Sequence, residues 1–206
     1  MRLGQARSGK GTQFALVKVK DRLEDFFLMD YTIFNVEGTE FISSINVDQL
    51  KACTLLPSLT EKSLVNLGFS SGLISFALGF DVVKPIFPPA NYNSTFTFNL
   101  SLIVLLMNNL NIFRGQVEID AMFIEKRDNR DTLFVIEVKS DSSHKSLAKH
   151  KLLYPVLGVA KNVPNHTPTV PVYVKVLGIH FHIVECSVPD PRVEVVAITV
   201  KNSFNS

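Results

Sequence analysis

The stretch that decides the fold is GQVEIDAMFIEKRDNRDTLFVIEVKSDSSHKSLAKHKLLY, residues 115–154. Apolar residues dominate 117–124, a charged segment rich in turn-forming residues covers 125–131, and an apolar run follows from Leu133 to Ile136. Two such runs joined by a short polar connection are typical of antiparallel strands. The stretch therefore predicts a hairpin with strands over 117–124 and 132–138, the second of them buried at the centre of a sheet.

Acidic side chains recur on both predicted strands. Glu118 and Asp120 are two residues apart, so we expect them to share one face of the first strand, opposite their apolar neighbours. Glu137 and Lys139 likewise share a face at the end of the second strand. A carboxylate at the end of a buried strand is costly unless it is paired or binds a metal. Carboxylates are suitable ligands for Mg²⁺, and a lysine can orient an attacking water. Charged residues at the solvent-exposed end of a strand would give the same pattern without a catalytic role.

The spacing of these residues resembles a known signature. Asp120, sixteen intervening residues and then Glu137-Val138-Lys139 resemble the motif of the PD-(D/E)xK nuclease superfamily, which includes restriction endonucleases and Holliday-junction resolvases. Ile119 stands where the name of the motif has Pro. Further along, His150 and Tyr154 resemble the QxxxY element of one branch, with His in place of Gln.

The resemblance implies an α/β fold with a restriction-endonuclease-like mixed sheet flanked by helices, and Mg²⁺-dependent endonucleolytic hydrolysis of DNA, with Mn²⁺ as a substitute metal. Its implied metal ligands are Asp120 and Glu137, its third catalytic residue is Lys139, and its supporting residues are Glu118, His150 and Tyr154. It also implies a homodimer, because duplex DNA has two strands to cut. Inactive relatives use the same fold for DNA binding or assembly, and this alternative stays open.

Composition is consistent with a globular chain. The 206 residues are 46% hydrophobic and 19% charged, which excludes a disordered chain, and the net charge of +2 permits nucleic-acid binding without requiring it. Cys53 and Cys186 match no metal-ligand spacing and indicate buried thiols in a reducing compartment. No apolar run is long enough to span a membrane and the basic N-terminus lacks a secretory pattern, so we expect a cytoplasmic protein.

The first ninety residues suggest a separate, mainly helical N-terminal region, 1–90, before a nuclease-like core over 91–206. The proline-rich segment 84–89 marks the boundary, and helices are predicted over 12–29, 47–55, 60–67 and 71–78, with a hairpin over 31–45. Gly4 and the string GKGTQ, residues 9–13, also fit a phosphate-binding loop of a nucleotide kinase. That alternative needs a strand before Gly4 and a helix after the loop.

Basic residues lie at two places where DNA phosphates are expected to bind. Arg7 and Lys10 belong to the glycine-rich N-terminus, and Lys145 and Lys149 lie on a helix predicted over 144–159, with His144 and His150 beside them. The remaining residues, 170–188 and 193–200, are rich in β-branched residues and predict further strands.

Overall fold

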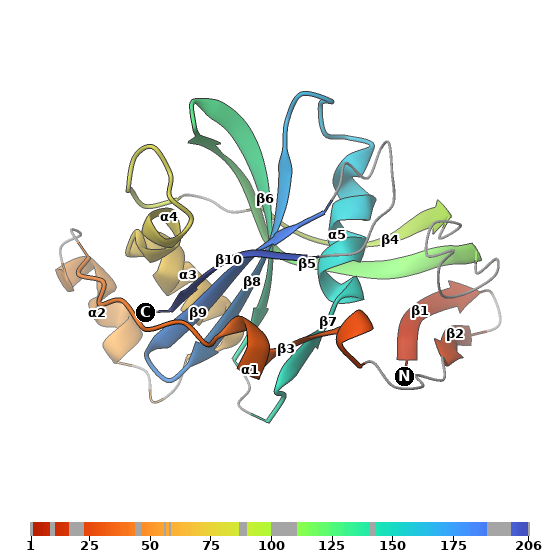
Figure 1. Ribbon diagram of the computed structural model, residues 1–206, viewed down its shortest axis with the longest axis horizontal. Coiled ribbons are helices and arrows are strands. Elements are labelled where there is room, and N and C mark those ends of the chain that lie inside the picture. Colours follow the sequence, from red (N-terminus) through yellow and green to blue (C-terminus); the bar gives the residue numbers. More distant parts are fainter. Residues whose placement is uncertain are drawn as a thin grey trace.

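The computed structural model describes residues 2–8, 11–16, 23–43, 47–55, 57, 59–86, 90–99, 111–140, 143–188 and 199–205 (Figure 1). The strands are β1 Arg2–Ser8, β2 Gly11–Leu16, β3 Phe27–Met29, β4 Ala90–Asn99, β5 Asn111–Arg127, β6 Arg130–Lys139, β7 Ser146–Ala148, β8 Thr169–Leu177, β9 His180–Ser187 and β10 Thr199–Asn205. The helices are α1 Asp30–Ile33, α2 Lys51–Thr54, α3 Glu61–Ser70, α4 Leu73–Ala77 and α5 His150–Ala160, with 3-10 turns η1 Leu23–Asp25 and η2 Val47–Leu50.

Eight of the described strands form one mixed sheet. Its order is β10-β9-β8-β6-β5-β1-β2, and β4 also pairs with β5. β6 runs parallel to β8 and antiparallel to β5, so β6 lies at the centre. The α/β class with a mixed sheet is therefore confirmed. Figure 1 shows the N-terminus near β1 and β2 at one end of the sheet and the C-terminus near β10 at the other.

The predicted hairpin, with strands over 117–124 and 132–138, is confirmed as β5 and β6. Residues 132–138 are all buried, as expected for a central strand. The polar connection is shorter than predicted, because the strands pair as far as Arg127 and Arg130 and only Asp128 and Asn129 form the turn. Both turn residues have positive φ, 53° and 57°, the conformation of a tight two-residue hairpin turn.

Two hydrophobic clusters cover the two faces of the sheet. On one face, α3 and α4 contribute Phe69 and Ile74, which pack with sheet residues such as Phe123 and Phe134. On the other face, α5, β3 and β7 pack over a different set of sheet residues, and this second cluster is called the α5 face below. Side chains from both sides of residue 90 therefore contribute to the same cores.

The mainly helical N-terminal region is not confirmed. Where a helix was expected over 12–29, β2 covers Gly11–Leu16 and pairs with β1, while β3 covers Phe27–Met29 and pairs with β7. The hairpin expected over 31–45 is also wrong, since α1 occupies Asp30–Ile33 and no strand is described over 34–43. The short helices expected near 47–55, 60–67 and 71–78 are confirmed as η2 with α2, as α3 and as α4.

The strand β2 also removes the helix that a phosphate-binding loop requires. Residues 11–16 continue the GKGTQ string as a strand paired with β1, in which Arg7 pairs with Thr12. A phosphate-binding loop holds its phosphates at the N-terminus of a helix, and a hairpin offers no such terminus. Gly9 and Lys10 themselves lie outside the described residues.

The helix expected over 144–159 begins later. Residues 146–148 form β7, and α5 begins at His150. The reason is tertiary, because β7 finds a strand partner in β3, with Leu28 opposite Leu147. Local helix propensity is weak enough for such pairing to override it.

Candidate active site

Asp120 lies at a β-bulge in β5. Along β4, Ala90 pairs with Met122 and Tyr92 pairs with Ile119, so β5 has one extra residue between these two pairs. A bulge of this kind bends a strand and redirects its side chains. Asp120 therefore occupies the point where β5 changes the face that it presents.

The cores on either side of the bulge show the change of face. Val117 and Ile119 belong to the α5 face, whereas Ala121 and Phe123 belong to the opposite cluster. We expected these apolar residues to share one face along the whole strand. That prediction is wrong, because the extra residue at the bulge exchanges the faces to which odd- and even-numbered residues point. Glu118 is exposed and alternates with Val117 and Ile119, so it points away from the α5 face.

The carboxylate of Asp120 faces the end of β6. The β5–β6 ladder is continuous from Arg127 to Ala121, which pairs with Ile136. Beyond it, Asp120 Oδ2 accepts a hydrogen bond of 2.8 Å from the backbone N–H of Val138. The Asp120 side chain thus satisfies an amide of β6 between Glu137 and Lys139, which brings the two halves of the predicted motif together.

Glu137 and Lys139 form an ion pair on the α5 face. Glu137 alternates with Leu133 and Val135, both members of that cluster, and its side chain is only 6% exposed. Lys139 Nζ lies 2.8 Å from Glu137 Oε1 and donates a 2.7 Å hydrogen bond to the carbonyl of Val138. The ammonium group thus compensates the charge of a buried carboxylate.

The electrostatics show how close the charged groups are. Burial raises the pKa of Glu137 to about 7, the Lys139 ammonium lowers it, and the charge of Asp120 raises it again. Lys151, an exposed residue of α5, also lowers the pKa of Glu137, by a smaller amount. The charges of Asp120, Lys139 and Lys151 therefore all act on Glu137, the last of them from the helix.

His150 and Tyr154 are one turn apart on α5, with ring centroids 5.2 Å apart. Burial, and then the charge of Lys151, lower the pKa of His150 to about 4, so the imidazole is neutral at pH 7. Burial raises the pKa of Tyr154 to about 12. His150 therefore adds no positive charge to the basic cluster in which the sequence placed it.

The predicted DNA-contacting residues fall into two groups. Lys145 is exposed just before β7, and Lys149 lies between β7 and α5, where its charge acts on Cys186 of β9. Arg7 belongs to β1, but its side chain and the whole of Lys10 lie outside the described residues.

Three residues beside the site were not predicted. Lys175 and Tyr173 are the partners of Lys139 and Glu137 in the parallel β6–β8 register, and Asp30 at the start of α1 forms an ion pair with Lys175. The signal for Lys175 was present, since it is a single charge within the apolar run VPVYVKVL, residues 170–177. Such a charge requires a partner, but the sequence does not say which acid supplies it.

The donor set is compatible with a hard divalent cation. Asp120 and Glu137 supply carboxylate oxygens on neighbouring strands, and Mg²⁺ usually takes one or two carboxylates and keeps several waters. Within the described part of the chain, no group of three or more His, Cys, Asp or Glu side chains has the spacing of a metal site. A magnesium ion bound by these two carboxylates would keep most of its coordination positions for water.

None of the described helices has the length and apolar character that crossing a membrane requires.

Comparisons with known proteins identify the family. The curated proteins and the solved structures gave no match to the chain. A family model described as a domain of unknown function, DUF6997, matches residues 28–204, which include most of β3, the whole candidate site and most of β10. The chain therefore belongs to the DUF6997 family.

Proposed function

We propose that the protein is a metal-dependent endonuclease that hydrolyses DNA phosphodiester bonds, of the restriction or repair type. The observation that carries this proposal is the bulged strand β5, which directs Asp120 onto the amide of Val138, between Glu137 and Lys139. The resemblance to the PD-(D/E)xK motif rested on spacing alone, and this contact supplies a spatial reason for it.

In the proposed reaction, the oxygen of a water molecule bonds to phosphorus while the bond from phosphorus to one sugar oxygen breaks and that oxygen takes a proton. Asp120 and Glu137 would hold Mg²⁺ or Mn²⁺, which when bound supplies positive charge to the phosphate and acidifies water. Lys139, paired with Glu137, would orient the attacking water. Lys145 and Lys149 would bind the neighbouring phosphates, and a homodimer would present two such sites to a duplex.

Plasmid nicking tests the catalytic proposal. We expect cleavage of supercoiled DNA with Mg²⁺ or Mn²⁺ and none with EDTA. Asp120→Asn, Glu137→Gln and Lys139→Met are each expected to lower the rate by about 100-fold or more. A matched control is Glu125→Gln, which alters another carboxylate of β5, one that pairs with Lys84 at 3.0 Å and lies on the hairpin side of the bulge. Undiminished cleavage by Glu137→Gln would contradict the proposal.

The lysines of the proposed DNA-binding surface are tested by the salt dependence of affinity. Lys145→Ala and Lys149→Ala are each expected to lower the slope of log affinity against log salt by about 0.9 for each phosphate that the variant no longer neutralises. Lys161→Ala is the control, because Lys161 is exposed at the opposite end of α5. Equal slopes for all three variants would show that Lys145 and Lys149 do not neutralise DNA phosphates.

A second candidate is a DNA-binding or assembly module without catalysis. The contacts of Lys139 with Glu137 and with the Val138 carbonyl favour it, because they engage both the carboxylate and the ammonium that catalysis would use. DNA affinity that is retained without metal-dependent nicking would identify this second function.

A further inference from the structure

A second buried ion pair lies beside the candidate active site. Lys175 on β8 is 2% exposed, and its Nζ contacts Asp30 Oδ2 and the carbonyl of His144. In the β6–β8 register Lys175 is the direct partner of Lys139, as Tyr173 is of Glu137. Since paired residues of neighbouring strands point to the same face, the second pair lies on the same face of the sheet as the first.

The Asp30–Lys175 pair is part of a larger attachment. The backbone N–H of Asp30 donates to the carbonyl of Lys145 at 3.0 Å, and the N–H of Lys149 donates to the carbonyl of Phe26 at 2.9 Å. Between these bonds, β3 and β7 pair along their whole length. Residues 26–30 therefore hold both ends of segment 144–149.

Segment 144–149 connects the two halves of the proposed site. It follows Lys139, the last residue of β6, after a short connection and leads directly into His150 and Lys151 of α5. The charge of Lys151 acts on Glu137. Burial, followed by the charges of Asp30 and Glu137, raises the pKa of Tyr173, which places both carboxylates near one phenol ring. A shift of the segment would therefore move Lys149 and Lys151 relative to Glu137.

The Asp30–Lys175 pair is incompletely satisfied. Asp30 Oδ1 is the one buried side-chain oxygen or nitrogen of the described residues that has no hydrogen-bond partner. Buried ion pairs with unsatisfied atoms are poor sources of stability, and an apolar pair often stabilises a core at least as well. Stability alone therefore gives little reason for this pair at this position.

We propose that the Asp30–Lys175 ion pair is a positioning element of the active site, which fixes segment 144–149 and thereby the first turn of α5 against Glu137 and Lys139. The proposal rests on the proposed function, because it assigns the pair a role in DNA hydrolysis. Neither residue acts on the substrate directly. The pair acts through the His144 and Lys145 carbonyls and the β3–β7 ladder.

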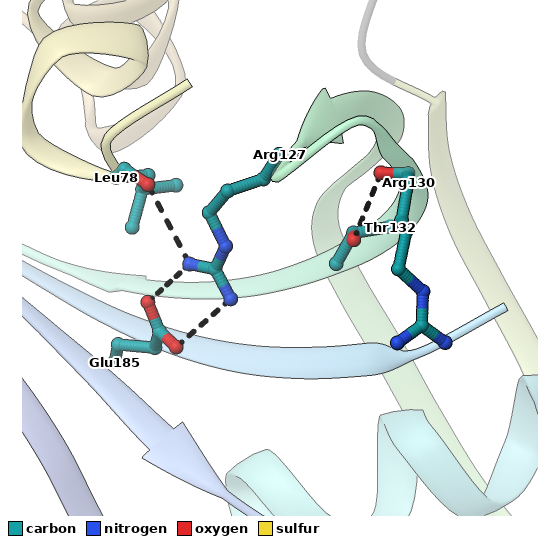
Figure 2. Close-up of polar contacts among 5 residues, drawn as sticks. All are labelled: Leu78, Arg127, Arg130, Thr132 and Glu185. Carbon is teal, nitrogen blue, oxygen red and sulfur yellow. Dashed lines mark hydrogen bonds and ion pairs between the residues drawn. The ribbon is translucent and has the colours of Figure 1, made fainter. Parts of the chain in front are cut away.

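The main test replaces both members of the pair, Asp30→Asn with Lys175→Met, so that no unpaired charge remains buried. The matched control is Arg127→Met with Glu185→Gln. These residues form another buried pair, with N–O distances of 2.5 and 3.1 Å, in which Arg127 Nη1 also lies 3.5 Å from the Leu78 carbonyl at the C-terminus of α4 (Figure 2). Both double variants remove a buried ion pair, but only the first pair contacts segment 144–149.

Two readouts are measured on each double variant. Amide hydrogen exchange of 144–149 is expected to accelerate about tenfold or more in the Asp30/Lys175 variant and to stay unchanged in the control. In the nicking assay, kcat is expected to fall about tenfold while KM changes less than threefold, since misplaced groups lower the rate more than ground-state binding. Lys175→Arg, which keeps the cation, is expected to restore kcat to within about threefold of the unmodified protein.

The outcomes separate the two proposals. If the unmodified protein does not nick DNA, the proposed function fails. If amide exchange of 144–149 is also unchanged in the Asp30/Lys175 variant, the ion pair does not fix this segment and the positioning proposal fails as well. If the protein nicks DNA and the Asp30/Lys175 variant retains full kcat, the positioning role is overturned while the nuclease assignment stands. A fall in kcat that the Arg127/Glu185 variant reproduces overturns it as well, because a general loss of rigidity then explains the result.

Discussion

Arg127 reaches across the face that α3 and α4 cover. Its guanidinium lies 5.2 Å from the centre of the Phe134 ring and binds both carboxylate oxygens of Glu185 on β9. The side chains of Arg127 and Glu185 are 16% and 5% exposed, so either charge left alone would be largely buried. The fork geometry of Arg matches a carboxylate, and lysine would not reproduce both bonds.

Removing one member of this pair is expected to cost more than removing both. Arg127→Met should lower the free energy of unfolding by about 3–5 kcal/mol, because Glu185 then remains buried without a cation, whereas the double variant with Glu185→Gln should cost less. Urea unfolding of both single variants and the double variant measures the difference. Additive losses would show that the pair is not coupled.

His150 predicts a pH dependence of stability. Its pKa is about 4 in the folded protein and 6.5 in the unfolded chain, so the unfolded chain binds more protons between these values. Stability from His150 is thus fully present above pH 6.5 and is lost as the pH falls towards 4. Allowing for partial exposure, the loss is about 1–2 kcal/mol.

The measurement compares the unmodified protein with His150→Gln in urea unfolding at several pH values. Glu137, whose pKa is raised to about 7, titrates in both proteins. The difference in the free energy of unfolding between the two proteins therefore isolates the contribution of His150. We expect the difference to change between pH 6.5 and 4 and to be constant above that range. A difference that is constant down to pH 4 would contradict an imidazole buried in its neutral form.

At the scale of elements, the β5–β6 turn is fixed by Asp81, a residue of the loop that follows α4. Both carboxylate oxygens of Asp81 accept hydrogen bonds from the turn, from Asp128 N–H at 3.0 Å and Asn129 N–H at 3.1 Å. The backbone N–H of Asp81 in turn donates to the carbonyl of Lys126 at 3.3 Å. Asp81 therefore connects the end of the long hairpin to the loop that follows α4.

Asp81→Ala is expected to destabilise the protein by about 1 kcal/mol, the low end for two charge-assisted hydrogen bonds, because the group is exposed. Thermal or urea unfolding measures the loss. Asp131→Ala is the control, since it removes another exposed carboxylate from the same hairpin. A loss as large for Asp131→Ala would assign the effect to charge alone.

At the scale of the molecule, the two faces of one sheet should unfold together. Phe69 of α3 is 1% exposed and packs edge-on against Phe123, with ring centroids 5.2 Å apart, while Tyr154 and Tyr173 lie in the cluster on the opposite face. Both clusters share β5, β6, β8 and β9, so neither can lose its packing without the strands that the other needs.

Phe69→Ala is accordingly expected to cost about 3–5 kcal/mol and to shift every probe of unfolding by the same amount. The chain has no Trp, and two of its four tyrosines, Tyr154 and Tyr173, lie in the α5 face, so tyrosine fluorescence reports in part on that face. Far-ultraviolet circular dichroism reports on the whole chain. We expect coincident urea midpoints for the two signals. A tyrosine transition that stays in place would show that the two faces of the sheet unfold as separate units.

The extent to which the fold could be predicted follows from the range of the interactions. The β5–β6 hairpin, the buried β6, the helices α3 and α4 and the convergence of Asp120 with Glu137 and Lys139 all follow from patterns within a few tens of residues. The bulge at Asp120 was not visible, because Ile119, Ala121 and Phe123 keep a regular spacing of two in the sequence although the strand changes face between Ile119 and Ala121. Lys175 was recognisable as a buried charge, but its partner Asp30 lies in a distant part of the chain.

The sequence by itself determined the α/β class, the central hairpin and the acidic and basic residues at its end, because alternation and turn chemistry act locally. Only the tertiary structure decided that 146–148 is a strand, that 27–29 pairs with it, that Glu118 faces away and that Asp30 neutralises Lys175. Each of these depends on which distant segment supplies a hydrogen-bond or charge partner. The packing of the whole chain decides which segments become partners, so the periodicity of one stretch does not predict them.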